Sequence, residues 1–385
     1  MPPVRLVLTL PGLLAAPDDL GPRPPRQAGE TSAGRGERAG KTSAARRHRA
    51  AASTTPHLAR LIAAAGTPRV APEGTGAALA SMYGIARQLD WPLAAIRLYA
   101  QGGAPGTAYW LAADPVTLVA GRDDVRLTTA VTDLAPEHAA ALIATLNAHF
   151  AADAVEFSAP QPAAWFVRAT AAQAMVTCPL EMAVGRTLRG LLPTGTDAGK
   201  WRRWQNEIQM LLHEHPVNQA RERQGLPPAN SVWFSGGGTC PPPYAATIAT
   251  YAGGGIAAAL AAHAGAPART LPDGLADVLA DLRTHSRGDV RADVLATGTG
   301  RATAVIALDP PLDLAAVERD WAAPAWAALA RGTVEAVTML ADGDGRTVVW
   351  TALRPGRWER LAARLRSPEL STLLAAAPPA PAEAA

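Results

Sequence analysis

Residues 211–238 read LLHEHPVNQARERQGLPPANSVWFSGGG and are the densest polar segment of the chain. A long helix predicted over residues 199–215 ends at His215, because a residue before proline is biased away from the helical conformation. A short basic helix, a turn at Pro227-Pro228 and a buried strand at residues 231–234 are expected to follow. Helices and strands in this mixed order indicate an α/β or α+β fold.

Three consecutive glycines, Gly236, Gly237 and Gly238, come shortly after the predicted strand. In a loop, such glycines leave backbone N–H groups free to approach an anion closely. The nearby Arg221 and Arg223 could complete a clamp for a phosphate or a carboxylate. The segment lacks the Lys-Ser/Thr pair of a P-loop, so a tight turn without a ligand remains the competing interpretation.

Two histidines, His213 and His215, lie at the end of the predicted long helix. They are two residues apart, so they diverge on a helix, where a metal-binding pair needs a spacing of three or four. No neighbouring cluster of Cys, Asp or Glu completes a site. The sequence therefore predicts no metal at this segment.

The overall composition narrows the class of protein. The chain has 385 residues, a formal net charge of +3 and 2 cysteines. This length allows two or three domains and a large core. Cys178 and Cys240 cannot make a disulfide scaffold or a four-thiolate metal site, so we expect a reduced, cytoplasmic protein.

The basic excess is concentrated between Arg23 and Arg49, where eight basic and two acidic residues give a local charge of +6 and leave −3 for the rest. Residues 17–55 contain almost no large apolar residue, so burial cannot offset the entropy of ordering them. We expect a disordered basic insertion there and a disordered tail at residues 376–385. A basic tract can bind nucleic acid, but this one lacks the aromatics that stack on bases, which disfavours that partner.

The first apolar run, residues 4–16, reads VRLVLTLPGLLAA. It is too short to cross a bilayer, which takes about 20 residues. A signal peptide and a buried first strand are both compatible with the run, and Pro11-Gly12 favours the strand because that pair is typical of a turn into a loop. No later run is long enough to cross a membrane, so no membrane contact is expected.

Further local patterns predict individual elements. Residues 136–150 form an amphipathic helix pattern, and residues 95–99 have the composition of a short strand. Thr55 and Pro56 are expected to begin a capped helix. Asp342 to Gly345 separates two strand-like runs and is typical of a hairpin turn, with its carboxylates as turn formers.

Residues His215 to Gly238 resemble the matching segment of archaeal-type cofactor-independent phosphoglycerate mutases, which belong to the alkaline phosphatase superfamily. The segment is still more similar to the RpfE-type regulatory proteins of proteobacteria, which also place a Trp before the glycines. Residues 110–150 and 250–274 are similar to that family in amino-acid sequence and in the order of their segments. The resemblance covers about Leu79 to Gly274.

The resemblance implies an alkaline-phosphatase-like α/β fold, in which a central sheet flanked by helices carries a smaller inserted α/β domain. The first strand would lie in residues 1–16, the rest of the core in residues 56–375, and the insertion at about 95–190. An active mutase of this superfamily uses a Ser nucleophile and two divalent metals held by Asp and His, which stabilise the entering and leaving oxygens.

This chain departs from the mutase pattern at the expected metal ligands. Pro11-Gly12 stands where the first strand should end in a metal-binding Asp. Residues 178–182 lack the His of a Pro-His-Asp sequence, and residues 305–318 supply only Asp309 and Asp313. The interpretation is a catalytically degenerate, metal-free protein without a cofactor, with a regulatory or phospho-ligand-sensing role.

The residues that transfer from the resemblance are candidates for binding a small phosphorylated or carboxylate ligand. Several of them also have purely structural interpretations, such as a cap at the turn for Asn230 and a surface pair with Glu222 or Glu207 for Arg223. The candidates are His215, Asn218, Arg221, Arg223, Asn230, Gly236, Gly237 and Gly238.

A second interpretation keeps an enzymatic function. The chain would then be an active Mn²⁺- or Zn²⁺-dependent phosphoglycerate mutase or phosphatase with rearranged ligands. These ligands would include Asp309, Asp313 and a histidine such as His285.

Overall fold

The computed structural model describes residues 4–15, 55–122, 124–244, 248–285, 302–356 and 368–379. The expected disordered insertion at 17–55, apart from Thr55, lies outside these ranges, as do residues 380–385 of the expected tail. The chain divides into two compact units. The first comprises Met1–Thr75, Thr247–Ala257 and Ala268–Ala380, and the second Gly76–Ala246, Ala258–Pro267 and Pro381–Ala385.

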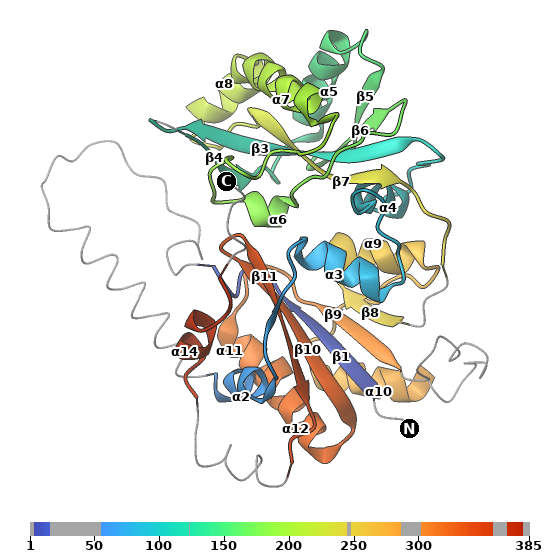
Figure 1. The fold of residues 1–385 in the computed structure, drawn as a ribbon, viewed down its shortest axis with the longest axis vertical. Coiled ribbons are helices and arrows are strands. Elements are labelled where there is room, and N and C mark those ends of the chain that lie inside the picture. The colour runs from blue at the N-terminus through green and yellow to red at the C-terminus, as the bar shows by residue number, and fades with distance from the viewer. Residues whose placement is uncertain are drawn as a thin grey trace, which may run out of the picture. The chain divides into compact units, whose positions relative to one another are not determined.

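The described residues of the first unit form a six-stranded sheet in the order β2-β11-β10-β1-β9-β8 (Figure 1). Strands β8, β9, β1 and β10 are parallel to their neighbours, whereas β10 pairs antiparallel with β11, and β11 with β2. The bounds are β1 Val4–Leu10, β2 Arg69–Val70, β8 Ile248–Ala252, β9 Thr303–Ala307, β10 Val334–Gly343 and β11 Arg346–Leu353.

The first strand occupies the middle of this sheet. Six of the seven residues of β1 are buried, as expected for a parallel strand covered on both faces. The strand interpretation of the first apolar run is therefore confirmed. The predicted hairpin is also confirmed, because β10 and β11 pair with Asp342 opposite Thr347 and Gly343 opposite Arg346.

Helices of the first unit bury their apolar sides against one face of the sheet. Leu6 and Leu8 of β1 share a core cluster with Leu58 of α2, Val278 of α10 and Leu329 of α12. The elements are α2 Pro56–Ala64, α10 Leu275–His285, α11 Leu314–Ala316, the π-helical segment η2 Val317–Ala322, α12 Ala323–Arg331 and α14 Leu370–Ala375.

The start of α2 illustrates how a distant residue completes a local pattern. The helix begins at Pro56 as predicted, but the side chain of Thr55 makes no capping hydrogen bond. The carboxylate of Glu318, from η2, accepts the N–H groups of His57 at 2.9 Å and Leu58 at 3.0 Å. A carboxylate at a helix N-terminus also complements the helix dipole.

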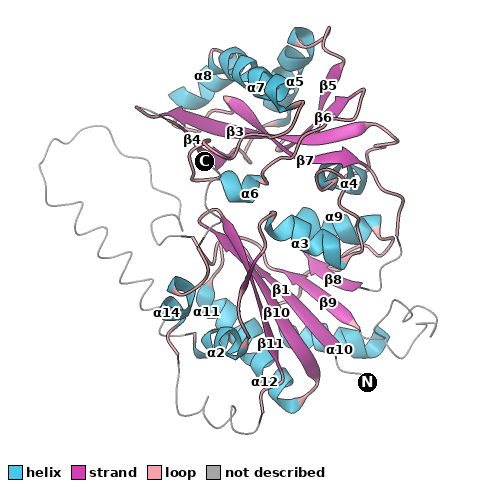
Figure 2. Cartoon of the chain, in the orientation of Figure 1, coloured by secondary structure: helices cyan, strands magenta, loops and turns pink. Residues whose placement is uncertain are grey.

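The second unit contains a sheet in the order β4-β3-β6-β5, with β7 on the other side of β3. Helices α5, α7 and α8 lie on one side of this sheet, and α4 and α6 on the other (Figures 1 and 2). The bounds are β3 Tyr109–Ala120, β4 Val125–Ala130, β5 Val155–Gln161, β6 Ala164–Ala169, β7 Ser231–Thr239, α4 Leu93–Ala100, α5 Pro136–His149, α6 Leu180–Ala183, α7 Ala198–His213 and α8 Pro216–Arg223.

Aromatic side chains form the core beneath α5 and α7. Trp201 packs edge-on against Trp204 and Phe234, and Phe150 contacts Trp204 and Phe157. Such pairs contribute beyond the area that they bury. The helices predicted at residues 136–150 and 199–215 are thereby confirmed as α5 and α7.

Two predictions of secondary structure were wrong. Residues 95–99 lie in α4 rather than in a strand, because a short apolar run fits either element and Ala, Leu and Arg favour the helix. Gly236–Gly238 lie inside β7 rather than in a loop, because the glycines allow β7 to pass close to neighbouring segments. The mixed α/β class itself is confirmed.

Two further helices, α3 Gly74–Met82 and α9 Gly255–His263, each begin in the first unit and continue into the second. Within the described part of the chain, no helix combines the length and the apolar character that a membrane crossing requires.

Candidate functional site

The four parallel strands of the first unit end at one edge of the sheet. The strands β8, β9, β1 and β10 run parallel to one another. The residues that follow Ala252 of β8, Ala307 of β9 and Leu10 of β1 therefore lie at the same edge as the end of β10. Open α/β sheets bind ligands outside the carboxyl ends of their strands. This carboxyl edge is therefore the candidate site of the first unit.

Asp342 joins three segments at the carboxyl edge. Its carboxylate accepts the N–H of Gly12, which follows β1, at 2.8 Å, and the hydroxyl of Thr75, in the first turn of α3, at 3.2 Å. The Thr347 hydroxyl lies 3.5 Å from that of Thr75. Burial raises the pKa of Asp342, and the two hydrogen bonds only partly oppose this effect.

This arrangement corrects the prediction that the hairpin carboxylates are turn formers. Asp344, at a φ of 52°, occupies the turn as expected, whereas Asp342 points to partners 330 and 267 residues away. Nothing in the local sequence identifies those partners.

The connection from β8 to α9 adds a glycine-rich turn to the same edge. Gly253, Gly254 and Gly255 link the two elements, and Gly255 has a φ of 71°. A Cβ atom on Gly253 would lie 2.7 Å from Oδ2 of the exposed Asp309, which follows β9. A strand, glycines and a helix N-terminus in succession favour anion binding. The glycine-rich anion site predicted from the sequence lies at Gly236–Gly238 instead.

A two-metal site at the carboxyl edge would need several carboxylate or imidazole side chains to converge there. Asp342 is engaged by Gly12 and Thr75, and Asp313 caps α11 by accepting the N–H of Ala315 at 2.9 Å. The side chain of His285 lies outside the described residues. Across the ranges that the structure describes, no group of three His, Cys, Asp or Glu could hold a metal ion. The described donors at this edge therefore do not by themselves assemble a two-metal centre.

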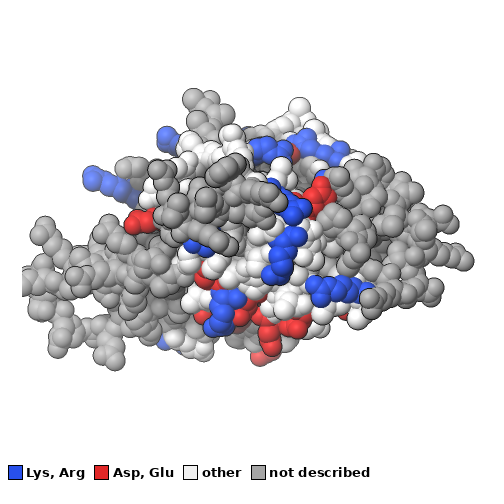
Figure 3. All heavy atoms as spheres, turned by 90° about the horizontal axis from the view of Figure 1, so that it is seen from below, with Lys and Arg blue, Asp and Glu red and all other residues white. Residues whose placement is uncertain are grey.

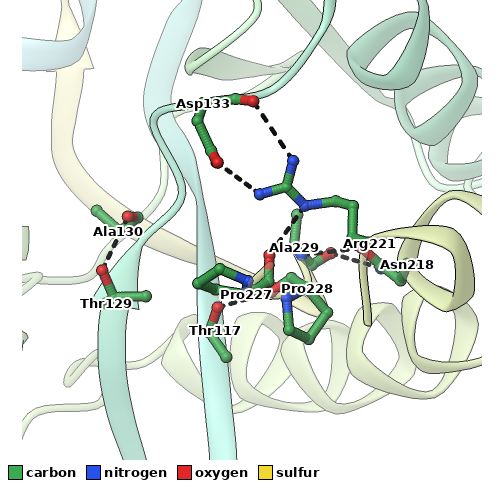
Figure 4. Close-up of polar contacts among 9 residues, drawn as sticks. All are labelled: Thr117, Thr129, Ala130, Asp133, Asn218, Arg221, Pro227, Pro228 and Ala229. Atoms are coloured by element: carbon green, nitrogen blue, oxygen red, sulfur yellow. Dashed lines mark hydrogen bonds and ion pairs between the residues drawn. The ribbon is translucent and has the colours of Figure 1, made fainter. Parts of the chain in front are cut away.

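The candidates at the start of the motif His215 to Gly238 hold α8 to the segment before β7 (Figure 4). The buried Asn218 donates to the carbonyls of Leu212 at 2.7 Å and Ala229 at 2.9 Å, and accepts the N–H of Ala229 at 2.9 Å. Arg221, only 2% exposed, donates to the carbonyl of Pro227 and forms an ion pair with Asp133. Both side chains therefore have structural contacts.

His215 occupies the N-cap of α8. Its Nδ1 accepts the N–H of Val217 at 3.2 Å, and its Nε2 lies 3.2 Å from the hydroxyl of Thr145. Partial burial lowers the pKa of His215, and an Nδ1 that accepts a hydrogen bond must be unprotonated.

Asn230 and Arg223 differ in how accessible their side chains are to a ligand. Asn230 accepts the N–H of Leu118 and donates to its carbonyl, both at 2.8 Å, so its amide takes the place of a peptide group beside β3. Arg223 is exposed and donates to the carbonyl of Gln219 at 3.2 Å rather than to the expected Glu222 or Glu207. Arg223 can therefore reach a ligand more readily than Asn230.

The glycine amides of β7 already face a carboxylate of the chain itself. The N–H of Gly237 lies 3.3 Å from Oδ2 of Asp90, and the N–H of Gly236 donates to the hydroxyl of Thr177 at 2.9 Å. Thr177 in turn donates its hydroxyl and its N–H to Asp90. Sequence reasoning missed both residues, since neither belongs to a recognisable motif.

The basic tract from Arg23 to Arg49 lies outside the described residues. On the face drawn in Figure 3, the described Lys and Arg side chains lie interspersed with Asp and Glu.

Comparison with solved structures finds similarity over most of the chain. The cofactor-independent phosphoglycerate mutase from Thermoplasma acidophilum DSM 1728 is 14% identical over 90% of this chain and 89% of its own, with a TM-score of 0.35. The PH0037 protein from Pyrococcus horikoshii is 13% identical over 98% of this chain and 99% of its own, with a TM-score of 0.40. Neither a scan of protein-family models nor a search of curated proteins finds a match.

Proposed function

We propose that the chain is a catalytically degenerate relative of the phosphoglycerate mutases, with a regulatory role exerted through a small phosphorylated or carboxylate ligand. The observation that carries the proposal is the hydrogen-bonded set of Asp342, Thr75 and Gly12 at the carboxyl edge. An edge whose half-buried carboxylate is held by a hydroxyl and an amide has the character of a hydrogen-bonding site rather than a metal centre.

The electrostatics of the edge favour an anionic ligand more than the number of carboxylates suggests. The raised pKa of Asp342 makes its ionised form costly. The helices α3 and α9 both begin at this edge, and helix N-termini attract negative charge. Their amide groups would hold the ligand, and the Thr75 hydroxyl would turn from Asp342 to donate to it. The exposed Arg223, in the second unit, is proposed as a separate candidate and not as part of this site.

The rival proposal is an active metal-dependent mutase or phosphatase with rearranged ligands. One observation favours it, namely the exposed Asp309 beside Gly253 at the carboxyl edge. The capping role of Asp313 weighs against its use as a second ligand.

One experiment separates the two proposals. Purified full-length protein is assayed for interconversion of 3- and 2-phosphoglycerate with Mn²⁺ or Zn²⁺, and binding of 3-phosphoglycerate and inorganic phosphate is measured by calorimetry in EDTA. We expect binding that survives EDTA, and no turnover. Turnover that the chelator abolishes would establish the rival, and absence of any binding would remove the ligand-sensing role.

The residues of the edge can be tested in the same assay. Thr75→Val removes the hydroxyl and should weaken binding of the anion, whereas Thr75→Ser keeps it and should leave the affinity within about threefold, a fraction of a typical hydrogen bond.

A further inference from the structure

Several donors of the second unit converge on the carboxylate of Asp90. Oδ1 accepts the N–H of Trp91 at 2.8 Å, and Oδ2 accepts the N–H of Thr177 at 3.0 Å. Oδ2 also accepts the Thr177 hydroxyl, and the N–H of Gly237 lies 3.3 Å away. We call this set of donors the Asp90 cradle. It has the composition of an anion-binding nest of backbone amides.

The cradle is closed and preformed. Asp90 is only 5% exposed, and the Thr177 hydroxyl that it receives is itself fixed by the N–H of Gly236 at 2.9 Å. Gly236 has a φ of 67°, a conformation that glycine adopts readily. The donors from Thr177 and Gly237 lie outside the segment that carries Asp90, and they would keep their positions around another carboxylate of the same size, whereas the N–H of Trp91 moves with Asp90.

The segment that carries Asp90 is held to β7 by side chains rather than by strand pairing. The amide of Gln88 donates to the carbonyl of Thr239 at 2.7 Å and accepts its N–H at 3.0 Å. Residues 86–89 are exposed. The exposed residues 86–89 can move at lower cost than a paired strand, because few buried contacts are lost.

We propose that Asp90 is an internal occupant of the anion site predicted at Gly236–Gly238, and that an external carboxylate must displace it to bind there. The ligand class is a small carboxylate, since the cradle is shaped around one. The regulatory part of this inference rests on the proposed ligand-sensing function, whereas the occupancy of the cradle does not.

The first test replaces the internal carboxylate with an external one. Asp90→Gly removes the equivalent of one acetate, and we expect the variant to melt roughly 5 °C or more below the wild type. Added acetate or formate should restore the melting temperature saturably, and chloride at equal ionic strength should not. The wild type should not respond.

A matched control is Asp197→Gly, because Asp197 accepts a single N–H, from Ala174 at 2.7 Å, at an exposed site. It should show no recovery with acetate. Asp90→Asn fills the cradle without a charge and should likewise not respond. A lack of carboxylate-specific recovery in Asp90→Gly would overturn the proposal. If Asp90→Gly is insoluble, it is purified in parallel in acetate and in chloride buffers. Soluble protein in acetate alone supports the proposal, and insoluble protein in both buffers overturns it.

The second test measures 3-phosphoglycerate binding to the wild type, Asp90→Gly and Asp197→Gly. The carboxylate of 3-phosphoglycerate would enter the cradle in addition to any binding at the carboxyl edge, so removal of the internal competitor should raise the affinity of the cradle in Asp90→Gly alone, by about tenfold or more. Equal affinities in the wild type and Asp90→Gly would overturn the competition while leaving the proposed function intact. If none of the three proteins binds 3-phosphoglycerate but acetate still restores the melting temperature of Asp90→Gly, the proposed ligand-sensing function is overturned and the carboxylate site at the cradle is supported.

Discussion

The carboxylate of Asp342 accepts the backbone N–H of Gly12 at 2.8 Å, although 330 residues separate the two. The contact links the end of β10 to the turn after β1, and the same carboxylate reaches Thr75 at the beginning of α3. One side chain thus links the segments that build the carboxyl edge.

Substitution of Asp342 is expected to destabilise the protein. Asp342→Ala leaves the half-buried N–H of Gly12 and the hydroxyl of Thr75 without their acceptor, which should lower the free energy of unfolding by about 2–3 kcal/mol. Urea unfolding measures the change. Asp344→Asn is the control, because Asn tolerates the positive φ of this turn residue, and it should change the value by less than about 0.5 kcal/mol. Equal effects of the two substitutions would contradict the anchoring role.

The pH dependence of stability should report the environment of Asp342. Its pKa is raised in the folded protein above the unfolded value, so the folded state binds the proton more tightly and this contribution stabilises the protein fully at pH values below the unfolded pKa. It is lost as the pH rises through the raised folded pKa. Relative to Asp342→Asn, the wild type should therefore lose stability from about pH 4 upward, measured by urea titrations at successive pH values. A difference in the free energy of unfolding between the two proteins that does not change with pH would show that Asp342 does not titrate as described.

The contacts of Asn218 are expected to matter for folding rather than only for a ligand. Asn218→Ala removes three hydrogen bonds at a fully buried site and should cost about 3 kcal/mol. The exposed neighbour Gln219→Ala should cost less than about 0.5 kcal/mol. Thermal and urea unfolding compare the two variants, and a stable Asn218→Ala protein would refute the structural role.

Glycine at position 237 is required by the close approach of Tyr109. A Cβ atom there would lie 2.2 Å from the Tyr109 hydroxyl, so Gly237→Ala should destabilise the protein by about 1–3 kcal/mol. Addition of Tyr109→Phe should recover part of the loss. Gly199→Ala is the matched control, because nothing lies within 4 Å of its Cβ position in α7. It should be neutral or stabilising by up to about 1 kcal/mol. Similar losses at both glycines would exclude the steric explanation.

Much of the secondary structure could be predicted from the sequence. Apolar periodicity located α5, the end of α7 follows from Pro216, and the stretch from Asp342 to Gly345 marked the hairpin. These patterns are local, since each depends on residues within one or two turns of the chain. The same local reasoning failed at residues 95–99, where a short apolar run was compatible with both a helix and a strand.

The candidate site was recovered only in part. The sequence drew attention to Gly236–Gly238, but not to Asp90, whose carboxylate lies against the amide of Gly237. It identified Asp342 as a turn residue, but not as the acceptor for Gly12 and Thr75.

The sequence by itself determined that the chain is a mixed α/β protein with a buried first strand and a polar motif at residues 211–238. Only the tertiary structure decided which polar groups face each other. The physical reason is that a buried carboxylate is satisfied by whichever donors the fold brings to it. For Asp342 and Asp90 these include donors 330 and 147 residues away along the chain.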